Sequence, residues 1–118
     1  MNIEKLNSFC QALPGTVVDV QWENVLTYKV GGKIYCLARL DSEILKFNLK
    51  CDPEEVLDLR ERFLAVGPGY HMNKKYWITV TADGSISDNL LCLWIEKSYR
   101  LIVDKLSHNQ RRQCGLVI

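Results

Sequence analysis

This sequence has little excess charge of either sign. Among its 118 residues, 15 are Lys or Arg and 14 are Asp or Glu, which gives a formal net charge of +1. Proteins that bind nucleic acid over most of their surface are strongly basic. Any nucleic-acid site in this chain must therefore be a local patch.

The sequence also lacks long apolar runs and closely spaced cysteines. No stretch is long and apolar enough to span a bilayer, and Asn2, Glu4 and Lys5 interrupt the segment where a signal peptide would have its apolar core. The five cysteines are widely spaced, without the CxxC spacing that zinc and redox sites use. We expect a cytoplasmic protein with reduced thiols, no metal and no membrane contact.

Recognisable catalytic and cofactor motifs are missing as well. The glycines are spaced for turns and form neither a dinucleotide-binding fingerprint nor a phosphate-binding loop. No Ser or Cys nucleophile lies in a recognisable elbow. We expect no cofactor and no enzymatic activity. An enzymatic role for His71 is an alternative that needs a deep pocket with a carboxylate or thiol in reach.

Apolar periodicity divides the chain into helices and strands. Helical spacing predicts helices over residues 2–13, from Asp52 to Gly67-Pro68-Gly69, from Ser85 or Ser87 to Leu106, and after a Ser107 cap. Alternation with a period of two predicts strands over residues 17–20, 25–30, 33–39, 45–50 and 77–81. The absence of repeats and linkers favours one domain, residues 1–118.

Helices with one apolar stripe must cover the apolar side of such a sheet. The sequence therefore predicts an α+β fold, a two-layer sandwich with an antiparallel β-sheet and helices packed on one face. Residues of the second helix expected on its buried side are Val56, Leu57, Leu59, Phe63 and Leu64. Residues expected on the outer face of the sheet are Thr27, Lys29, Lys33, Tyr35, Arg39, Lys46, Asn48, Lys50, Trp77, Thr79 and Thr81. Cations and rings on one face suit phosphate contact and base stacking, although lysine and threonine are also ordinary solvent-facing strand residues.

The segment from Tyr70 to Thr81 carries the densest set of polar and aromatic side chains. His71 suits either a ligand contact or a structural hydrogen bond, because an unperturbed imidazole titrates near neutrality. Trp77 is expected to be partly exposed as a stacking surface, although a shift of one residue in the strand would bury it.

The polar residues between His71 and Trp77 also allow two interpretations. Asn73 suits a turn that leads into the strand. Lys74 and Lys75, which follow it, are placed to reach a phosphate backbone beside the sheet.

A composite pattern, His-x-Asn-Lys-x-x-Trp-x-Thr-Val followed by Asp-Gly-Ser, runs through this segment. The pattern is carried by His71, Asn73, Lys74, Trp77, Thr79, Val80 and Asp83-Gly84-Ser85. Further matching residues elsewhere in the chain are Pro14-Gly15, Lys50, Asp52-Pro53-Glu54 and Ser98-Tyr99. In these positions the chain resembles the MmcQ/YjbR-like family of small bacterial proteins. The resemblance implies a stand-alone cytoplasmic domain without a cofactor, with a fold likened to a double-wing DNA-binding motif and to secretion chaperones.

The leading hypothesis from sequence and resemblance is a non-enzymatic DNA-binding protein that uses the outer sheet face. Its expected DNA-binding residues are Lys46, Lys50, His71, Asn73, Lys74, Lys75, Trp77 and Thr79. The alternative is a protein-interaction or chaperone-like module that uses the same face for a protein partner. In either case we expect a monomer or a weak homo-oligomer.

Overall fold

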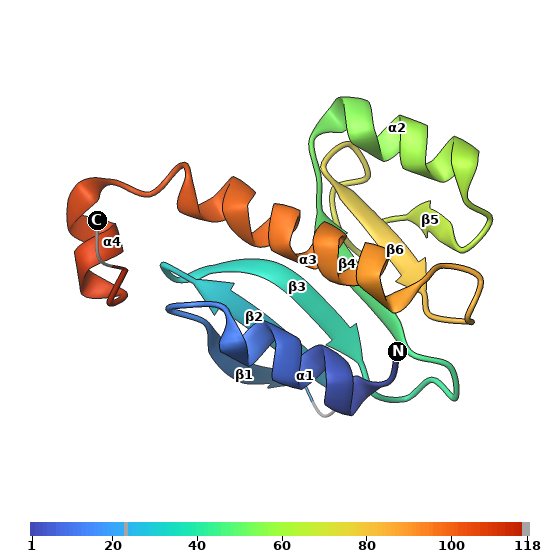
Figure 1. Cartoon of the computed structure of the whole chain (residues 1–118), viewed down its shortest axis with the longest axis horizontal. Helices are drawn as coiled ribbons and strands as arrows, with labels where there is room; N and C mark the ends of the chain where they lie inside the picture. The colour runs from blue at the N-terminus through green and yellow to red at the C-terminus, as the bar shows by residue number, and fades with distance from the viewer. Residues whose placement is uncertain (23, 117–118) are drawn as a thin grey trace.

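The computed structural model describes residues 1–22 and 24–116, which fold into four helices and a six-stranded β-sheet (Figure 1). In chain order the elements are α1 (Ile3–Ala12), β1 (Val17–Trp22), β2 (Val25–Val30), β3 (Lys33–Arg39), β4 (Lys46–Lys50), α2 (Pro53–Arg62), β5 (Val66–Pro68), β6 (Trp77–Thr81), α3 (Asp88–Val103) and α4 (His108–Gln113). The strands make a sheet with the order β1-β2-β3-β4-β6-β5, and every neighbouring pair is antiparallel. The predicted α+β class is confirmed.

Helices α1 and α3 lie over the same face of the sheet, and α2 packs near β5 and β6 (Figure 1). Phe47, Leu49, Ile78 and Val80 point into this helix-covered side and are fully buried in the main core cluster. The opposite side, which we call the outer face, carries the intervening residues of the same strands. Within the part of the chain that the structure describes, no helix is both long and apolar enough to cross a membrane.

Local capping signals set the starts of α3 and α4 as expected, whereas the Asp52 side chain makes no capping hydrogen bond at the start of α2. Ser87 accepts a hydrogen bond from the Leu90 main-chain N–H at the start of α3, and Ser107 forms a capping box with Gln110 at the start of α4. Pro53 occupies the first turn of α2. Each of these caps forms between residues close together in the sequence, so the sequence alone is enough to predict it.

The end of α2 differs from the prediction. The helix stops at Arg62, and Val66–Pro68 forms the edge strand β5 instead of a helix terminator. Because α2 covers only the margin of the sheet, Leu57 and Leu64 lie exposed and not on a buried side as expected. Val66 pairs with Val80, so this segment extends the sheet at its edge.

A register shift in β3 corrects two further predictions. Tyr28 pairs with Cys36 and Lys29 with Ile34, so Tyr35 is an extra residue in the ladder. The bulge turns Tyr35 toward the helices, where its ring packs edge-on against Tyr99 at 5.4 Å. Lys33 pairs with the buried Val30 and also lies on the helix side, so the outward parity expected for Lys33 and Tyr35 was wrong.

Helix α3 closes the gap that opens beyond the end of the β3–β4 ladder. The hydroxyl of Ser98, which is fully buried, donates to the Tyr35 carbonyl at 2.5 Å and accepts from the Lys50 main-chain N–H at 2.9 Å. One helical side chain thereby satisfies a donor and an acceptor that the sheet leaves unpaired. It also sets the position of Lys50 relative to α3.

Candidate functional site

The outer face is partly covered by the segment from Gly69 to Tyr76, which we call the β5–β6 loop. Asn48 and Thr79 are cross-strand partners on β4 and β6, and both point outward as expected. Asn48 is nevertheless only 1% exposed. A hydrogen-bond network with the loop explains this burial.

Three groups form that network, which we call the loop clamp. The Asn48 side-chain amide donates to the Tyr70 carbonyl at 2.9 Å, and the Tyr70 main-chain N–H donates to Thr79 Oγ1 at 2.9 Å. The Thr79 hydroxyl in turn donates to Asn48 Oδ1 at 2.7 Å. Thr79, expected to contact nucleic acid, therefore uses its hydroxyl to hold Tyr70 on the sheet.

Two consecutive turns shape the β5–β6 loop. Met72 N–H donates to the Gly69 carbonyl at 3.2 Å, and His71 has φ of 60° at the position where a type II turn requires a positive value. The second turn runs from Asn73 to Tyr76, and Asn73 Oδ1 accepts from the Lys75 N–H at 2.9 Å. Asn73 therefore takes the turn role that its residue type predicted.

Trp77 is buried, so the expectation of partial exposure was wrong. The Trp77 side chain lies on the outer side of β6 as predicted, yet it is only 8% exposed. It lies outside the main core cluster. The cause is the close approach of the loop. A Cβ on Gly69 would lie 2.5 Å from the Trp77 Cβ, a contact that only glycine allows. Trp77 supports the loop and offers no stacking surface.

The loop places two exposed rings beside the cations of the outer face. The Arg39 guanidinium carbon lies 4.2 Å from the centre of the Tyr70 ring, and the Tyr70 and His71 rings are 4.0 Å apart with an angle of 56° between their planes. Lys46 is the cross-strand partner of Arg39. We call Arg39, Lys46, Tyr70 and His71 the cation–aromatic patch.

The structure brings Lys46 and His71 into this patch and adds Arg39 and Tyr70, which sequence reasoning left out of the site. Arg39 carried a usable signal, because its outward parity in β3 was visible. Its contact with Tyr70 joins residues far apart in the sequence, and no local pattern shows it.

The remaining predicted cations lie toward the other end of β4. Lys50 pairs with Trp77, and the Cys51 N–H donates to the Tyr76 carbonyl at 2.7 Å, so the turn with Lys74 and Lys75 lies beside this end. Both turn lysines are exposed, and the Lys75 ammonium lies 5.6 Å from the centre of the Tyr76 ring.

The site has no arrangement that indicates a nucleophile or a metal. His71 is exposed, and within residues 1–22 and 24–116 it makes no hydrogen bond or ion pair to a carboxylate or thiol. Residues 1–22 and 24–116 contain no group of three His, Cys, Asp or Glu side chains that could hold a metal ion.

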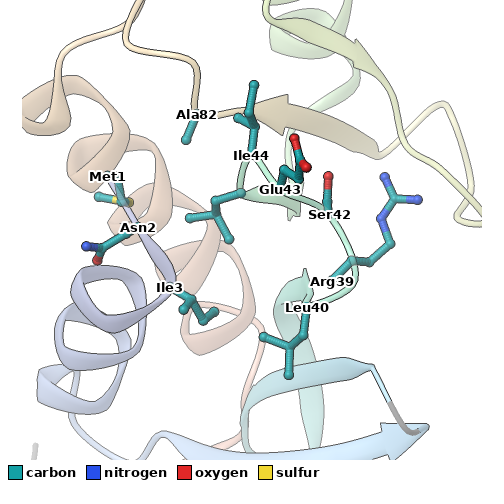
Figure 2. A pocket seen from close by; sticks show the side chains of 10 residues that line it. Met1, Asn2, Ile3, Arg39, Leu40, Ser42, Glu43, Ile44 and Ala82 are labelled. Carbon is teal, nitrogen blue, oxygen red and sulfur yellow. The ribbon is translucent and has the colours of Figure 1, made fainter.

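A hollow borders the patch near the start of α1. It has a volume of about 310 Å³ and is lined by Met1, Ile3, Leu40 and Ile44 among others; Figure 2 shows that these side chains come from the start of α1 and from the β3–β4 connection. Arg39 lines this hollow as well, but its side chain extends away from the apolar residues (Figure 2).

Comparison with known proteins shows the family to which this chain belongs. A family model described as YjbR matches residues 11–101. The chain therefore belongs to the YjbR family, as its resemblance indicated.

The uncharacterized Escherichia coli K12 protein YjbR is 30% identical over 95% of this chain and 96% of its own length. The uncharacterized protein YbdF of Escherichia coli O157:H7 is 38% identical over 73% of this chain and 70% of its own. The crystal structure of Deinococcus radiodurans protein DR2400, with a DUF419 domain, superposes with a TM-score of 0.90 at 33% identity, covering 98% of this chain and 89% of that one.

Proposed function

We propose that this protein is a non-enzymatic, cytoplasmic DNA-binding protein that contacts the duplex through its outer face. The observation that carries the proposal is the cation–aromatic patch, in which the Arg39 guanidinium lies over the Tyr70 ring, the tilted His71 ring lies against Tyr70, and Lys46 is the cross-strand partner of Arg39. The guanidinium and ammonium groups supply charge for phosphates, while the exposed rings supply flat surfaces for sugars and bases.

The loop clamp supports this proposal because it orders the patch before a ligand binds. Tyr70 is held at both its N–H and its carbonyl. A side chain that is already positioned loses less conformational entropy on binding, so a small patch can contribute more of its contact energy to affinity.

The charge distribution also supports a local interface. Within the described residues, neither Arg39 nor Lys46 has a carboxylate within ion-pair distance, whereas Lys29, Lys97 and Arg100 are paired with acids. On the outer face, Arg39 and Lys46 therefore have no ion pair among the described residues, whereas Lys29 on the same face is paired with Asp19. Lys74 and Lys75 extend the same side of the molecule.

Salt dependence gives the proposal a quantitative test. Phosphate contacts from Arg39, Lys46, Lys74 and Lys75 correspond to a slope of log K against log salt of about −3.6. Raising the salt from about 50 to about 200 mM should therefore weaken binding about 100-fold. Fluorescence anisotropy with a labelled duplex measures this directly.

The variant Arg39→Gln/Lys46→Gln should reduce the magnitude of the slope by about 2, because it removes two phosphate contacts. The matched control is Arg60→Gln/Arg62→Gln on α2, which removes the same charge from exposed helical positions. The control should keep the wild-type slope. Absence of binding in low salt, or equal losses in both variants, would contradict the proposal.

A further inference from the structure

A second group of cations meets at the end of the sheet, outside the cation–aromatic patch. Lys33 begins β3 after the Gly31-Gly32 turn, Lys50 ends β4, and Lys105 follows the end of α3. Because β3 and β4 are antiparallel, the start of one strand lies beside the end of the other. We call Lys33, Lys50 and Lys105 the lysine triad.

Two packing contacts hold the triad together. Leu106 packs so tightly over the β2–β3 turn that a Cβ on Gly31 would lie 2.6 Å from its side chain, which fixes the end of α3 beside Lys33. The buried Ser98 hydroxyl bonds to the Lys50 main chain and ties the same helix to β4. The fold itself therefore sets the positions of these three lysine backbones.

The ionisation of Lys50 agrees with this backbone arrangement. The pKa of the Lys50 ammonium is lowered, first because the side chain is partly buried and then because Lys105 and Lys33 repel its charge. Asp52 and Asp104 are near in sequence, yet within the described residues no carboxylate lies within ion-pair distance of any of the three ammonium groups. Repulsion that no acid offsets is relieved by a bound anion.

We propose that Lys33, Lys50 and Lys105 bind a phosphate group, and that in a DNA complex this group is a backbone phosphate separate from those on the cation–aromatic patch. The DNA part of this inference rests on the proposed function. The phosphate chemistry itself does not, because a free oligophosphate offers the same oxygens.

The spacing of Lys46 and Lys50, one lysine from each cation group, fits a duplex. Lys46 and Lys50 stand at opposite ends of β4, four residues apart, which corresponds to about 13 Å along an extended strand. The major groove of B-DNA is about 12 Å wide. A duplex lying across β4 can therefore place phosphates from the two sides of one groove on Lys46 and Lys50 at once.

The test uses the exposed members of the triad and two probes. Lys33→Gln/Lys105→Gln removes two charges at exposed positions and leaves the partly buried Lys50 in place. The matched control is Lys5→Gln/Lys97→Gln, two exposed lysines on α1 and α3 that pair with Asp88 and Glu55. Circular dichroism checks that each variant folds.

The first probe is tripolyphosphate, measured by isothermal titration calorimetry at low salt. Wild type and control should bind it, and the triad variant should bind at least tenfold more weakly. Equal binding by all three proteins, or no binding by wild type, would overturn the phosphate site. This result does not depend on DNA.

The second probe is the labelled duplex used for the proposed function. Because the triad binds one phosphate, the triad variant should reduce the magnitude of the salt slope by up to about 0.9, and the control should leave it unchanged. An unchanged slope in the triad variant, with a reduced slope in Arg39→Gln/Lys46→Gln, overturns the DNA part of the inference and leaves the proposed function intact. Absence of duplex binding by wild type overturns both DNA proposals, and the tripolyphosphate titration alone then decides the site.

Discussion

Replacing Thr79 with Val tests whether the loop clamp positions the site. Valine keeps the β-branched shape that suits β6 but has no hydroxyl, so the Tyr70 N–H loses its acceptor and Asn48 Oδ1 loses its donor. Asn48 is almost fully buried, so water cannot readily replace the lost bond. Unpaired polar groups of this kind are costly.

The structure gives the size of the effect. Two lost hydrogen bonds at about 1 kcal/mol each, with a partial desolvation penalty for the unpaired Asn48 oxygen, lower the free energy of unfolding by about 2 to 3 kcal/mol. An unfolding entropy of about 2.1 cal/mol/K per residue converts this loss to a decrease in Tm of about 10 °C for a chain of this size. Urea denaturation and calorimetry measure the two quantities independently.

Thr81→Val is the matched control. Thr81 is two residues further along the same face of β6, and its hydroxyl makes no hydrogen bond among the described residues. Its replacement should change stability by less than about 0.5 kcal/mol. Amide exchange at Tyr70 should accelerate in Thr79→Val and remain slow in Thr81→Val. Equal stability of the two variants, with slow exchange at Tyr70 in both, would refute the clamp.

Two other predictions follow from the packing and the ionisation of buried groups. Gly69→Ala should destabilise the fold by about 1 to 3 kcal/mol, because the new Cβ would meet the Trp77 Cβ and main chain. A Cβ at Gly67 would meet open space, so Gly67→Ala should have little effect. Similar denaturation midpoints for the two variants would contradict this prediction. Burial, with help from Glu55, raises the pKa of the Cys51 thiol from 9.0 to about 12. Between about pH 9 and 12 the Cys51 thiol ionises in the unfolded chain but not in the folded one. The stabilisation linked to its raised pKa is therefore fully present below about pH 9 and is lost as the pH rises to about 12. Cys51→Ala should therefore flatten the fall in stability over that window in pH-dependent denaturation, and an unchanged slope would contradict the assignment.

The sequence predicted the elements that depend on neighbouring residues. The Ser87 and Ser107 caps, the alternation in β4 and β6, and the helix-covered face follow from spacing and side-chain chemistry within a few positions. The bulge at Tyr35 could not be read in the same way, because it is defined by the partner residues on β2. Strand β5 was missed since its three residues form a strand only by pairing with β6.

The site was predicted less completely for the same reason. Parity placed Lys46, Trp77 and Thr79 on the correct side of the sheet, but it does not show what else covers that side. The β5–β6 loop folds back over β6, buries Trp77 and occupies the Thr79 hydroxyl. Parity along a strand reports direction, whereas exposure depends on segments that pack there from elsewhere in the chain.

The composite pattern from His71 to Ser85 divides accordingly into residues that build the loop and residues that the loop presents. Asn73 caps a turn, Trp77 supports the loop from below, and Thr79 joins the clamp, while His71 and Lys74 remain exposed. A substitution in the first group should change stability and binding together, because the patch loses its support. A substitution of an exposed residue should change binding alone, so measuring both quantities separates positioning residues from ligand contacts.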